Sequence, residues 1–183
     1  MSHYDQMISE ITNVLSQVDP KSIERLADLI LKSRRIFLAG AGRSGLMVRC
    51  FAMRLMHMGF EASVVGETTT SRILGGDLLM IGSGSGETGS MAIFANKAKE
   101  NGAAVGLVTI FPDSTIAQLA DVKVIIQAPT SKKKLAGITP SIQPLGNLFE
   151  QCLLLVLDDL IINLMEKTKI DNDSMWQRHA NLE

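Results

Sequence analysis

Hydrophobic positions follow two different periods along this chain. Five short runs are apolar almost without interruption, which is typical of strands buried on both faces of a parallel sheet. Between these runs, apolar residues recur every three or four positions, and this spacing predicts amphipathic helices that cover the sheet. The predicted strands are 35–39, 62–65, 77–81, 104–110 and 122–126, and the predicted helices are 7–18, 20–30, 46–58, 88–101, 115–119 and 145–167.

The alternation of strands and helices indicates an α/β fold, a three-layer α/β/α sandwich around a five-stranded parallel sheet in the flavodoxin-like order. A chain of 183 residues suits a single domain. We expect this domain to span 1–183, with leading helices in 1–33 and a C-terminal tail at 168–183. Ligands bind beyond the carboxyl ends of the strands in such sheets. The loops after the first and third strands therefore mark the expected site.

A loop of alternating glycine and serine, 82–88, separates the third predicted strand from the next helix. Glycine lets the backbone approach a ligand closely, and a helix N-terminus offers unpaired N–H groups and the positive end of the helix dipole. Ser83, Ser85 and Thr88 add three hydroxyls that are able to donate to phosphate oxygens. No lysine follows, which excludes a Walker A loop. A plain turn with a capping hydroxyl is the simpler alternative, but the pattern favours an oxyanion site.

A second glycine loop, 40–45, follows the first predicted strand. Its three glycines match the dinucleotide-binding pattern, and Glu67 lies about where an acid that binds ribose is expected. The bulky cation Arg43 inside the loop and the shortness of the chain count against a dinucleotide. The serines of 82–88 would also have no role in binding a pyrophosphate. The pattern therefore leaves a dinucleotide site as the weaker interpretation.

Charge and apolar length argue against two classes of partner. The chain has 18 basic and 19 acidic side chains and a net charge of −1, whereas nucleic-acid binders carry a strong basic excess. The N-terminus lacks the basic and apolar regions of a signal peptide. The longest apolar helix is interrupted by Asp158 and Asp159, which argues against a membrane span. We expect a cytoplasmic protein without nucleic-acid or membrane partners.

The two cysteines, Cys50 and Cys152, both fall in predicted apolar helices. This placement predicts buried free thiols in a reducing compartment and not a disulfide. No group of histidines, cysteines and carboxylates has the spacing of a metal site. We therefore expect catalysis without a metal or another cofactor.

The two glycine loops, with Gly42 and Ser44 in the first and 82–88 in the second, resemble the SIS (sugar isomerase) domain family. The resemblance covers nearly the whole chain and is closest to the 6-phospho-3-hexuloisomerases. The chain departs from it at Ser71 and Arg72, where that family has small residues or proline. The segments that sharpen the resemblance are 53–59, 65–70, 141–151 and 178–183.

The resemblance implies a phosphosugar isomerase that interconverts D-arabino-3-hexulose 6-phosphate and fructose 6-phosphate through an enediol(ate). Such an enzyme serves formaldehyde fixation by the ribulose monophosphate pathway. Two other classes stay open: another aldose–ketose phosphosugar isomerase or a phosphosugar lyase on the SIS scaffold, and a non-catalytic module that binds sugar phosphates. The substrate-binding residues are then expected to be Gly42, Arg43, Ser44, Ser83, Ser85, Glu87 and Thr88.

Glu150 is the candidate catalytic base. It lies in the first turns of the long predicted helix, after a loop with proline and glycine that could bring it to the crevice. One carboxylate on one face of the sugar is able to remove the C2 proton and return it to C3. The alternative is a glutamate that only interacts with the helix dipole. Glu87 is a weaker candidate base, and we expect it to point away because phosphate would repel it.

Three further basic features have simple structural interpretations. Arg43 either stabilises the enediolate, binds the phosphate or forms a surface salt bridge. His57 lies among apolar residues, which favours a satisfied core histidine over a ligand. The run 132–134 is three lysines, typical of a solvated loop, with a lid that attracts anionic sugars as the alternative.

Two expectations concern other copies of the chain. The helix segment 153–164 is apolar on more than one face, which predicts a homo-oligomer, and the resemblance implies a tetramer. The tail carries His179, an imidazole that is able to move protons between the C2 and C3 oxygens. The far end of the long helix should lie about 30 Å from Glu150. We therefore expect His179 to complete the site of a neighbouring chain, with a disordered tail as the alternative.

Overall fold

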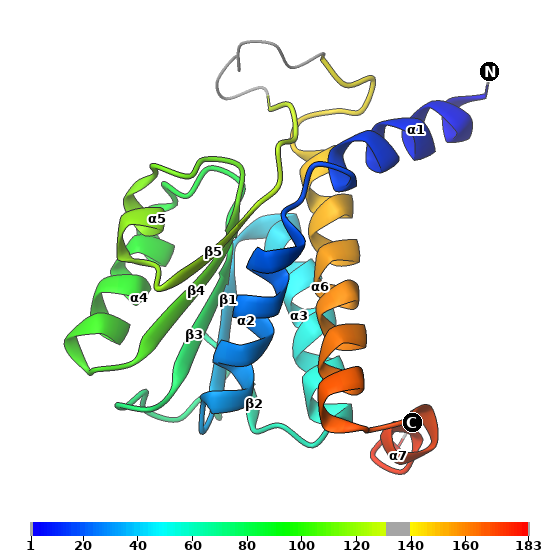
Figure 1. Ribbon diagram of the computed structural model, residues 1–183. Coiled ribbons are helices and arrows are strands. Elements are labelled where there is room, and N and C mark those ends of the chain that lie inside the picture. Colours follow the sequence, from blue (N-terminus) through cyan, green and yellow to red (C-terminus); the bar gives the residue numbers. More distant parts are fainter. Residues whose placement is uncertain (1, 131–139, 183) are drawn as a thin grey trace.

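A five-stranded, all-parallel sheet forms the centre of the computed structural model, which describes residues 2–130 and 140–182 (Figure 1). The strand order is β2-β1-β3-β4-β5, so the chain reverses its direction of winding between β1 and β3. This confirms the predicted flavodoxin-like order. The strands are β1 (Ile36–Gly40), β2 (Ala62–Val64), β3 (Leu78–Gly82), β4 (Ala104–Thr109) and β5 (Val122–Ile125).

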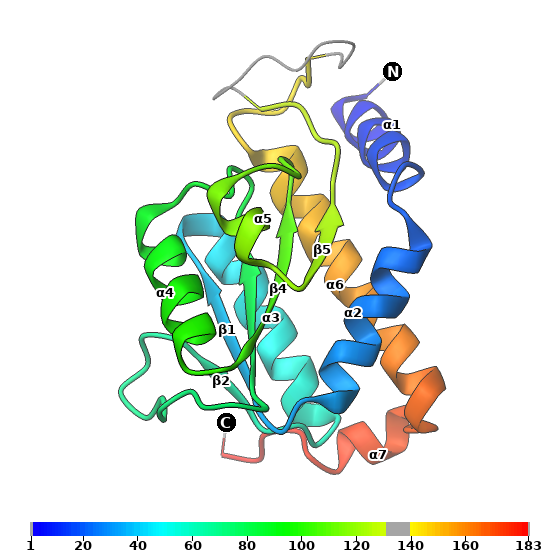
Figure 2. The same cartoon turned by 60° about the vertical axis from the view of Figure 1, so that its left-hand side comes forward.

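Helices cover both faces of the sheet and make the predicted three layers (Figures 1 and 2). One face carries α2, α3 and α6, and the other carries α4 and α5. Helix α1 extends beyond the sheet and lies against the first turns of α6. The helices are α1 (His3–Leu15), α2 (Pro20–Lys32), α3 (Gly42–His57), α4 (Gly89–Glu100), α5 (Thr115–Leu119), α6 (Asn147–Thr168) and α7 (Asn172–Trp176).

The strands divide their side chains between two apolar cores, because successive residues of a strand point to opposite faces. Phe37 and Leu79 pack with the buried residues of α4 and α5. Their neighbours Ile36 and Leu78 pack with those of α2, α3 and α6. Every residue of β3 is buried, which is why its sequence is apolar without interruption.

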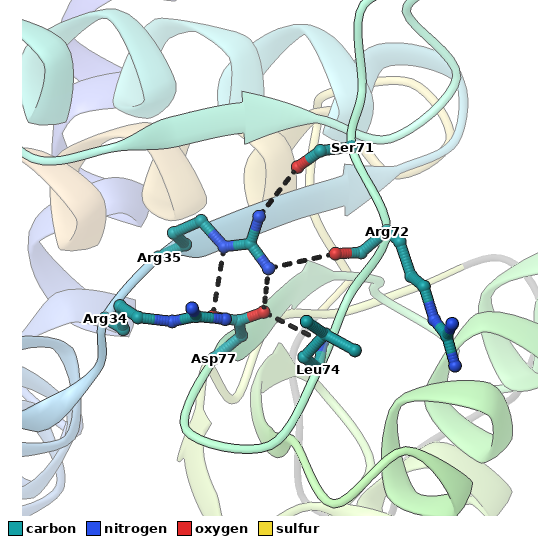
Figure 3. A network of polar contacts seen from close by, with 6 residues as sticks. All are labelled: Arg34, Arg35, Ser71, Arg72, Leu74 and Asp77. Carbon is teal, nitrogen blue, oxygen red and sulfur yellow. Dashed lines mark hydrogen bonds and ion pairs between the residues drawn. The ribbon is translucent and has the colours of Figure 1, made fainter.

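A buried carboxylate links the amino ends of β1 and β3 (Figure 3). Asp77, just before β3, accepts hydrogen bonds from Arg35 Nη2 at 2.7 Å and from Arg34 Nη2 at 3.2 Å. Arg35 also donates to Ser71 Oγ at 3.1 Å and to the carbonyl oxygen of Arg72 at 3.0 Å. The two positions that depart from the resembled family are thus tied to the start of β1, at the end of the sheet opposite the glycine loops.

One of the two cysteine predictions was wrong. Cys50 is exposed on α3, because only one side of this helix faces the sheet and α6. Cys152 is buried in α6 as predicted, and its burial raises the pKa of the thiol to about 11. A thiol that stays protonated at neutral pH is a poor nucleophile, so Cys152 serves as a core residue.

Candidate functional site

A cavity of about 460 Å³ lies beyond the carboxyl ends of β1 and β3, where the strand order reverses. Both glycine loops and the first turn of α6 contribute to its wall. The structure thus brings most of the predicted site together, although Glu87 and His179 lie outside this wall. The candidate residues that line the cavity are Gly42, Arg43, Ser44, Ser83, Ser85, Thr88 and Glu150.

The first glycine loop is explained by close packing of backbone on backbone. A Cβ atom added to Gly45 would lie 2.6 Å from the carbonyl oxygen of Gly40, so the start of α3 touches the end of β1. Gly42 has a φ of 57°, in the left-handed region that favours glycine. Glu67, the candidate ribose-binding acid, forms an ion pair with Arg49. These contacts account for the glycine pattern without a dinucleotide.

The second loop is shaped by its own serines. The buried hydroxyl of Ser83 accepts a hydrogen bond from the N–H of Gly86 at 3.2 Å and lies 3.4 Å from Thr88 Oγ1. Ser85 Oγ accepts one from the N–H of Glu87 at 3.2 Å. Gly86 has a φ of 61°, and a Cβ atom there would lie 1.9 Å from Ser114 Oγ. The loop is therefore held in one shape before any ligand arrives.

Three helices begin at this cavity, and none of them has a side-chain cap. The N-cap residues of α3, α4 and α6 are Ala41, Thr88 and Gly146, and no side chain of theirs accepts a cap hydrogen bond. Among the helices that begin elsewhere, the N-cap side chains of α1, α2 and α7 do accept one. The N-cap side chain of α5, Ser114, accepts none, but the N–H of Thr115 in its first turn donates to Glu87. Uncapped first turns present unpaired N–H groups and partial positive charge. Their convergence suits a doubly charged oxyanion such as a phosphate.

Glu87 points away from this cavity, as its negative charge led us to expect. Its carboxylate accepts hydrogen bonds from the N–H of Thr115 at 2.8 Å and from Thr115 Oγ1 at 2.7 Å, at the start of α5. These bonds lower the pKa of Glu87, so it stays ionised at neutral pH. Glu87 lines a neighbouring hollow of about 600 Å³ with Asp113 and other residues before α5.

Glu150 and Arg43 both line the cavity and form an ion pair with one another. Glu150 lies in the first turn of α6, and its side chain is 16% exposed. Arg43 Nε donates to Glu150 Oε2, and Arg43 Nη2 donates to Asn147 Oδ1. The salt bridge expected as one role for Arg43 therefore joins it to the candidate base. Asn147 is a site residue that sequence reasoning missed.

His179 lies at the other end of the molecule. Its ring stacks on Trp176, with ring centroids 4.9 Å apart, and on His57, with centroids 5.3 Å apart. Helix α7 follows the C-terminal end of α6, whereas Glu150 lies in the first turn of α6 (Figure 1). The intervening turns of α6 span about 27 Å at 1.5 Å per residue. The tail is folded, so the alternative of a disordered tail was wrong for the described part.

His57 is buried, as predicted, at the C-terminal end of α3. Its Nδ1 lies 3.3 Å from Arg54 Nη1, and its carbonyl oxygen accepts a hydrogen bond from Arg178 Nη1 at 3.5 Å. Burial, together with the charges of Arg54 and His179, lowers the pKa of His57. The lysines at 132–134 lie outside the described residues.

Two kinds of feature are absent from the residues that the structure describes. In 2–130 and 140–182, no three histidines, cysteines or carboxylates are grouped so that they could hold a metal ion. The helices of these same ranges include none with the length and hydrophobicity of a transmembrane segment.

Comparison with known proteins gives consistent matches. A model of the SIS domain family matches residues 29–155. The 3-hexulose-6-phosphate isomerase of Bacillus subtilis (strain 168) is 49% identical over 97% of this chain and 96% of its own length. The enzyme of that name from Mycobacterium gastri is 44% identical over 95% of this chain and 86% of its own length.

A solved structure extends these matches to the fold. The crystal structure of a hypothetical protein from Methanococcus jannaschii matches with a TM-score of 0.84 and 34% identity. A molecular function of 3-hexulose-6-phosphate isomerase was inferred for that protein from its structure. The match covers 100% of both chains. The chain thus belongs to the SIS domain family, together with relatives named 3-hexulose-6-phosphate isomerase.

Proposed function

We propose that this chain is a phosphosugar isomerase that interconverts D-arabino-3-hexulose 6-phosphate and fructose 6-phosphate. The observation that carries the proposal is the cavity in which Glu150, paired with Arg43, faces a serine loop and three uncapped helix N-termini. The names of the relatives support 3-hexulose 6-phosphate as one member of this pair. As part of this proposal, the enzyme works in the cytoplasm, in formaldehyde fixation by the ribulose monophosphate pathway.

Glu150 is the proposed base for the proton transfer. Its carboxylate removes the proton on C2 of the 3-hexulose, and the electron pair moves into a C2–C3 enediolate. The same carboxylate, now protonated, gives the proton to C3, and the C2 oxygen becomes the carbonyl of fructose 6-phosphate. The hydroxyl proton moves from the C2 oxygen to the C3 oxygen. Arg43, beside Glu150, offers a positive charge to the enediolate.

The decisive assay runs the reaction from fructose 6-phosphate. The protein is mixed with a 3-hexulose-6-phosphate synthase, which splits the 3-hexulose phosphate, and the released formaldehyde is measured. Formaldehyde should appear only when both proteins are present. Binding of fructose 6-phosphate without formaldehyde release would favour a binding module, and conversion of an aldose phosphate would favour another SIS isomerase.

The hydroxyls of the Gly-Ser loop should contribute mainly to substrate binding. Ser85→Ala and Thr88→Ala are each expected to raise KM by a factor that corresponds to about 1–3 kcal/mol, because each loses a donor to a charged oxygen. Ser83→Ala should raise KM and also lower the melting temperature, since Ser83 holds Gly86 inside the loop. Ser33→Ala, which removes a hydrogen-bonded hydroxyl at the end of α2, is the control. Unchanged KM values in all three loop variants would contradict phosphate binding here.

We further propose a homo-oligomer, a tetramer as in the resembled family, in which His179 completes the site of a neighbouring copy. Large apolar side chains are exposed on the outer sides of α3 and α6, where a second copy would cover them. The fold holds His179 at the end of α6 that lies away from its own Glu150. A partner's cavity is then the site that His179 serves. The exposed residues are Leu46, Met53, Met56, Leu155 and Ile162.

Mixing inactive subunits tests this shared site. Light scattering should first give a mass well above the 19.8 kDa of one chain. Glu150→Gln and His179→Ala proteins are then dissociated together and reassociated. In mixed oligomers, some sites combine an intact Glu150 with an intact His179, so activity should return. No return of activity in oligomers shown to be mixed would mean that His179 acts in its own chain or not at all.

A further inference from the structure

A series of hydrogen-bonded polar side chains leads from helix α1 to the candidate base. It begins at Glu10, whose Oε2 accepts hydrogen bonds from Ser141 Oγ at 2.6 Å and from Gln143 Nε2 at 2.9 Å. Glu10 Oε1 accepts one from the N–H of Ile142 at 2.9 Å. These bonds tie α1 to the segment that leads into α6. The catalytic steps proposed above do not involve these bonds.

The series of hydrogen bonds continues from this segment into the cavity wall. The buried Gln143 accepts a hydrogen bond at Oε1 from Asn147 Nδ2 at 2.7 Å. Asn147 Oδ1 in turn accepts from Arg43 Nη2, and Arg43 Nε donates to Glu150. Four successive contacts therefore connect a carboxylate on α1 with the carboxylate of the proposed base.

The chemistry of the two ends fixes the direction of every hydrogen bond between them. An ionised carboxylate only accepts, and a guanidinium only donates. The amide NH₂ of Gln143 must therefore face Glu10, and its oxygen must face Asn147. The NH₂ of Asn147 must then face Gln143, which leaves its oxygen for Arg43. Burial alone would raise the pKa of Glu10, but hydrogen bonds from Ser141, Gln143 and Ile142 outweigh it and lower the pKa, so the carboxylate stays ionised at neutral pH.

We propose that Glu10 is a positioning residue, which acts through the amides of Gln143 and Asn147 to hold Arg43 beside Glu150. This inference rests on the proposed role of Glu150 as the base. Arg43 is 60% exposed, and a long exposed side chain bound at one point keeps much of its rotamer freedom. The oxygen of Asn147 supplies the second point, so that the planar guanidinium is held in one orientation.

The variant Glu10→Gln should disturb this arrangement without changing the shape of the side chain. Its new NH₂ group must replace either Oε1, which faces the N–H of Ile142, or Oε2, which faces the NH₂ of Gln143. The first choice breaks a backbone contact. The second choice forces the amide of Gln143 to flip, and then the amide of Asn147. The NH₂ group of Asn147 then faces the guanidinium of Arg43, and because both groups only donate, the hydrogen bond between them is lost.

A second substitution should restore the direction of the bonds. In the double variant Glu10→Gln with Gln143→Glu, the carboxylate at position 143 accepts from the new amide on one side and from Asn147 on the other. The oxygen of Asn147 then faces Arg43 again. The net charge of the protein is unchanged by the exchange, which makes the double variant a matched control for the single one.

The experiment measures kcat and KM for the purified, folded oligomers of each variant. Glu10→Gln is expected to lower kcat by about tenfold with KM changed by less than about twofold, and the double variant should recover most of the kcat. In an Arg43→Ala background, Glu10→Gln should cause no further loss. Glu24→Gln, at an exposed position on α2, controls for the loss of a carboxylate. If Glu10→Gln does not fold, Gln143→Met breaks the same series of hydrogen bonds and should show the same dependence on Arg43.

The possible outcomes separate this inference from the proposed function. An equal loss of kcat in the presence and absence of Arg43, or no recovery in the double variant, would overturn the role of Glu10. So would an unchanged kcat in Glu10→Gln alongside a strong loss in Glu150→Gln, which would leave the proposed function intact. A fully active Glu150→Gln variant would overturn the assignment of the base, and this inference with it.

Discussion

Replacing Glu150 with glutamine is expected to lower kcat by roughly 10²–10⁴-fold with little change in KM. The amide keeps the size of the side chain and still accepts the hydrogen bond from Arg43, but it has no basic oxygen for the C2 proton. Glu150 lines the cavity from the first turn of α6, while the Gly-Ser loop lies on another part of the wall. Binding of the phosphate end should therefore survive the substitution, and the loss should fall on proton transfer.

Steady-state kinetics with fructose 6-phosphate measure this effect, and exchange of the substrate C2 or C3 hydrogen with solvent deuterium measures proton transfer directly. Both should fall together in Glu150→Gln. Glu67→Gln is the matched control, because Glu67 is also paired with an arginine of α3, Arg49, but lies outside the cavity wall. Retention of most of the kcat in Glu150→Gln would place the base elsewhere.

The fold could be predicted from the sequence because its three central strands, β1, β3 and β4, are almost entirely buried. All residues of β3 are buried, so the run 78–81 has no polar position to obscure it. Ends of elements were less certain, because they depend on single backbone angles. The long helix begins at Asn147 and not at 145, since Leu145 has a φ of 54°, which is not helical. The exposure of Cys50 depends on how α3 and α6 pack, which local spacing does not record.

The part of the site that is local in sequence could also be predicted. The loop 82–88 and the residues around Gly42 carry their own pattern of glycines and hydroxyls. The link from Glu10 to Gln143 joins residues 133 positions apart and exists only because α1 docks against the segment before α6. No short-range pattern marks such a pair. The stacking of His179 on His57 likewise depends on helix α7, and the polar sequence of the tail does not predict this helix.

Replacing Asp77 should produce the largest change in stability. Its side chain is fully buried and accepts hydrogen bonds from Arg35, from Arg34 and from the N–H of Leu74 at 2.8 Å. Asp77→Ala removes the carboxylate and leaves the guanidinium of Arg35, only 15% exposed, without its anionic partner. Removing one partner of a buried ion pair costs about 3–5 kcal/mol of unfolding free energy. Asp28→Ala, which breaks the exposed pair with Lys167, should cost less than about 1 kcal/mol.

The same carboxylate should make stability depend on pH in a defined direction. Burial alone would raise the pKa of Asp77, but the hydrogen bonds from Arg35 and Leu74 and the charges of Arg35 and Arg34 outweigh it, so the pKa lies below its ordinary value of 3.8. The unfolded chain then binds a proton at a higher pH than the folded chain does. The stabilisation is therefore complete above the ordinary pKa and is lost as the pH falls through the lower, folded-state pKa. Denaturant unfolding of the wild type and Asp77→Ala at about pH 7 and about pH 3 should show their difference shrinking in acid. A difference that stayed constant between the two pH values would show that Asp77 stabilises the fold by packing and not by its charge.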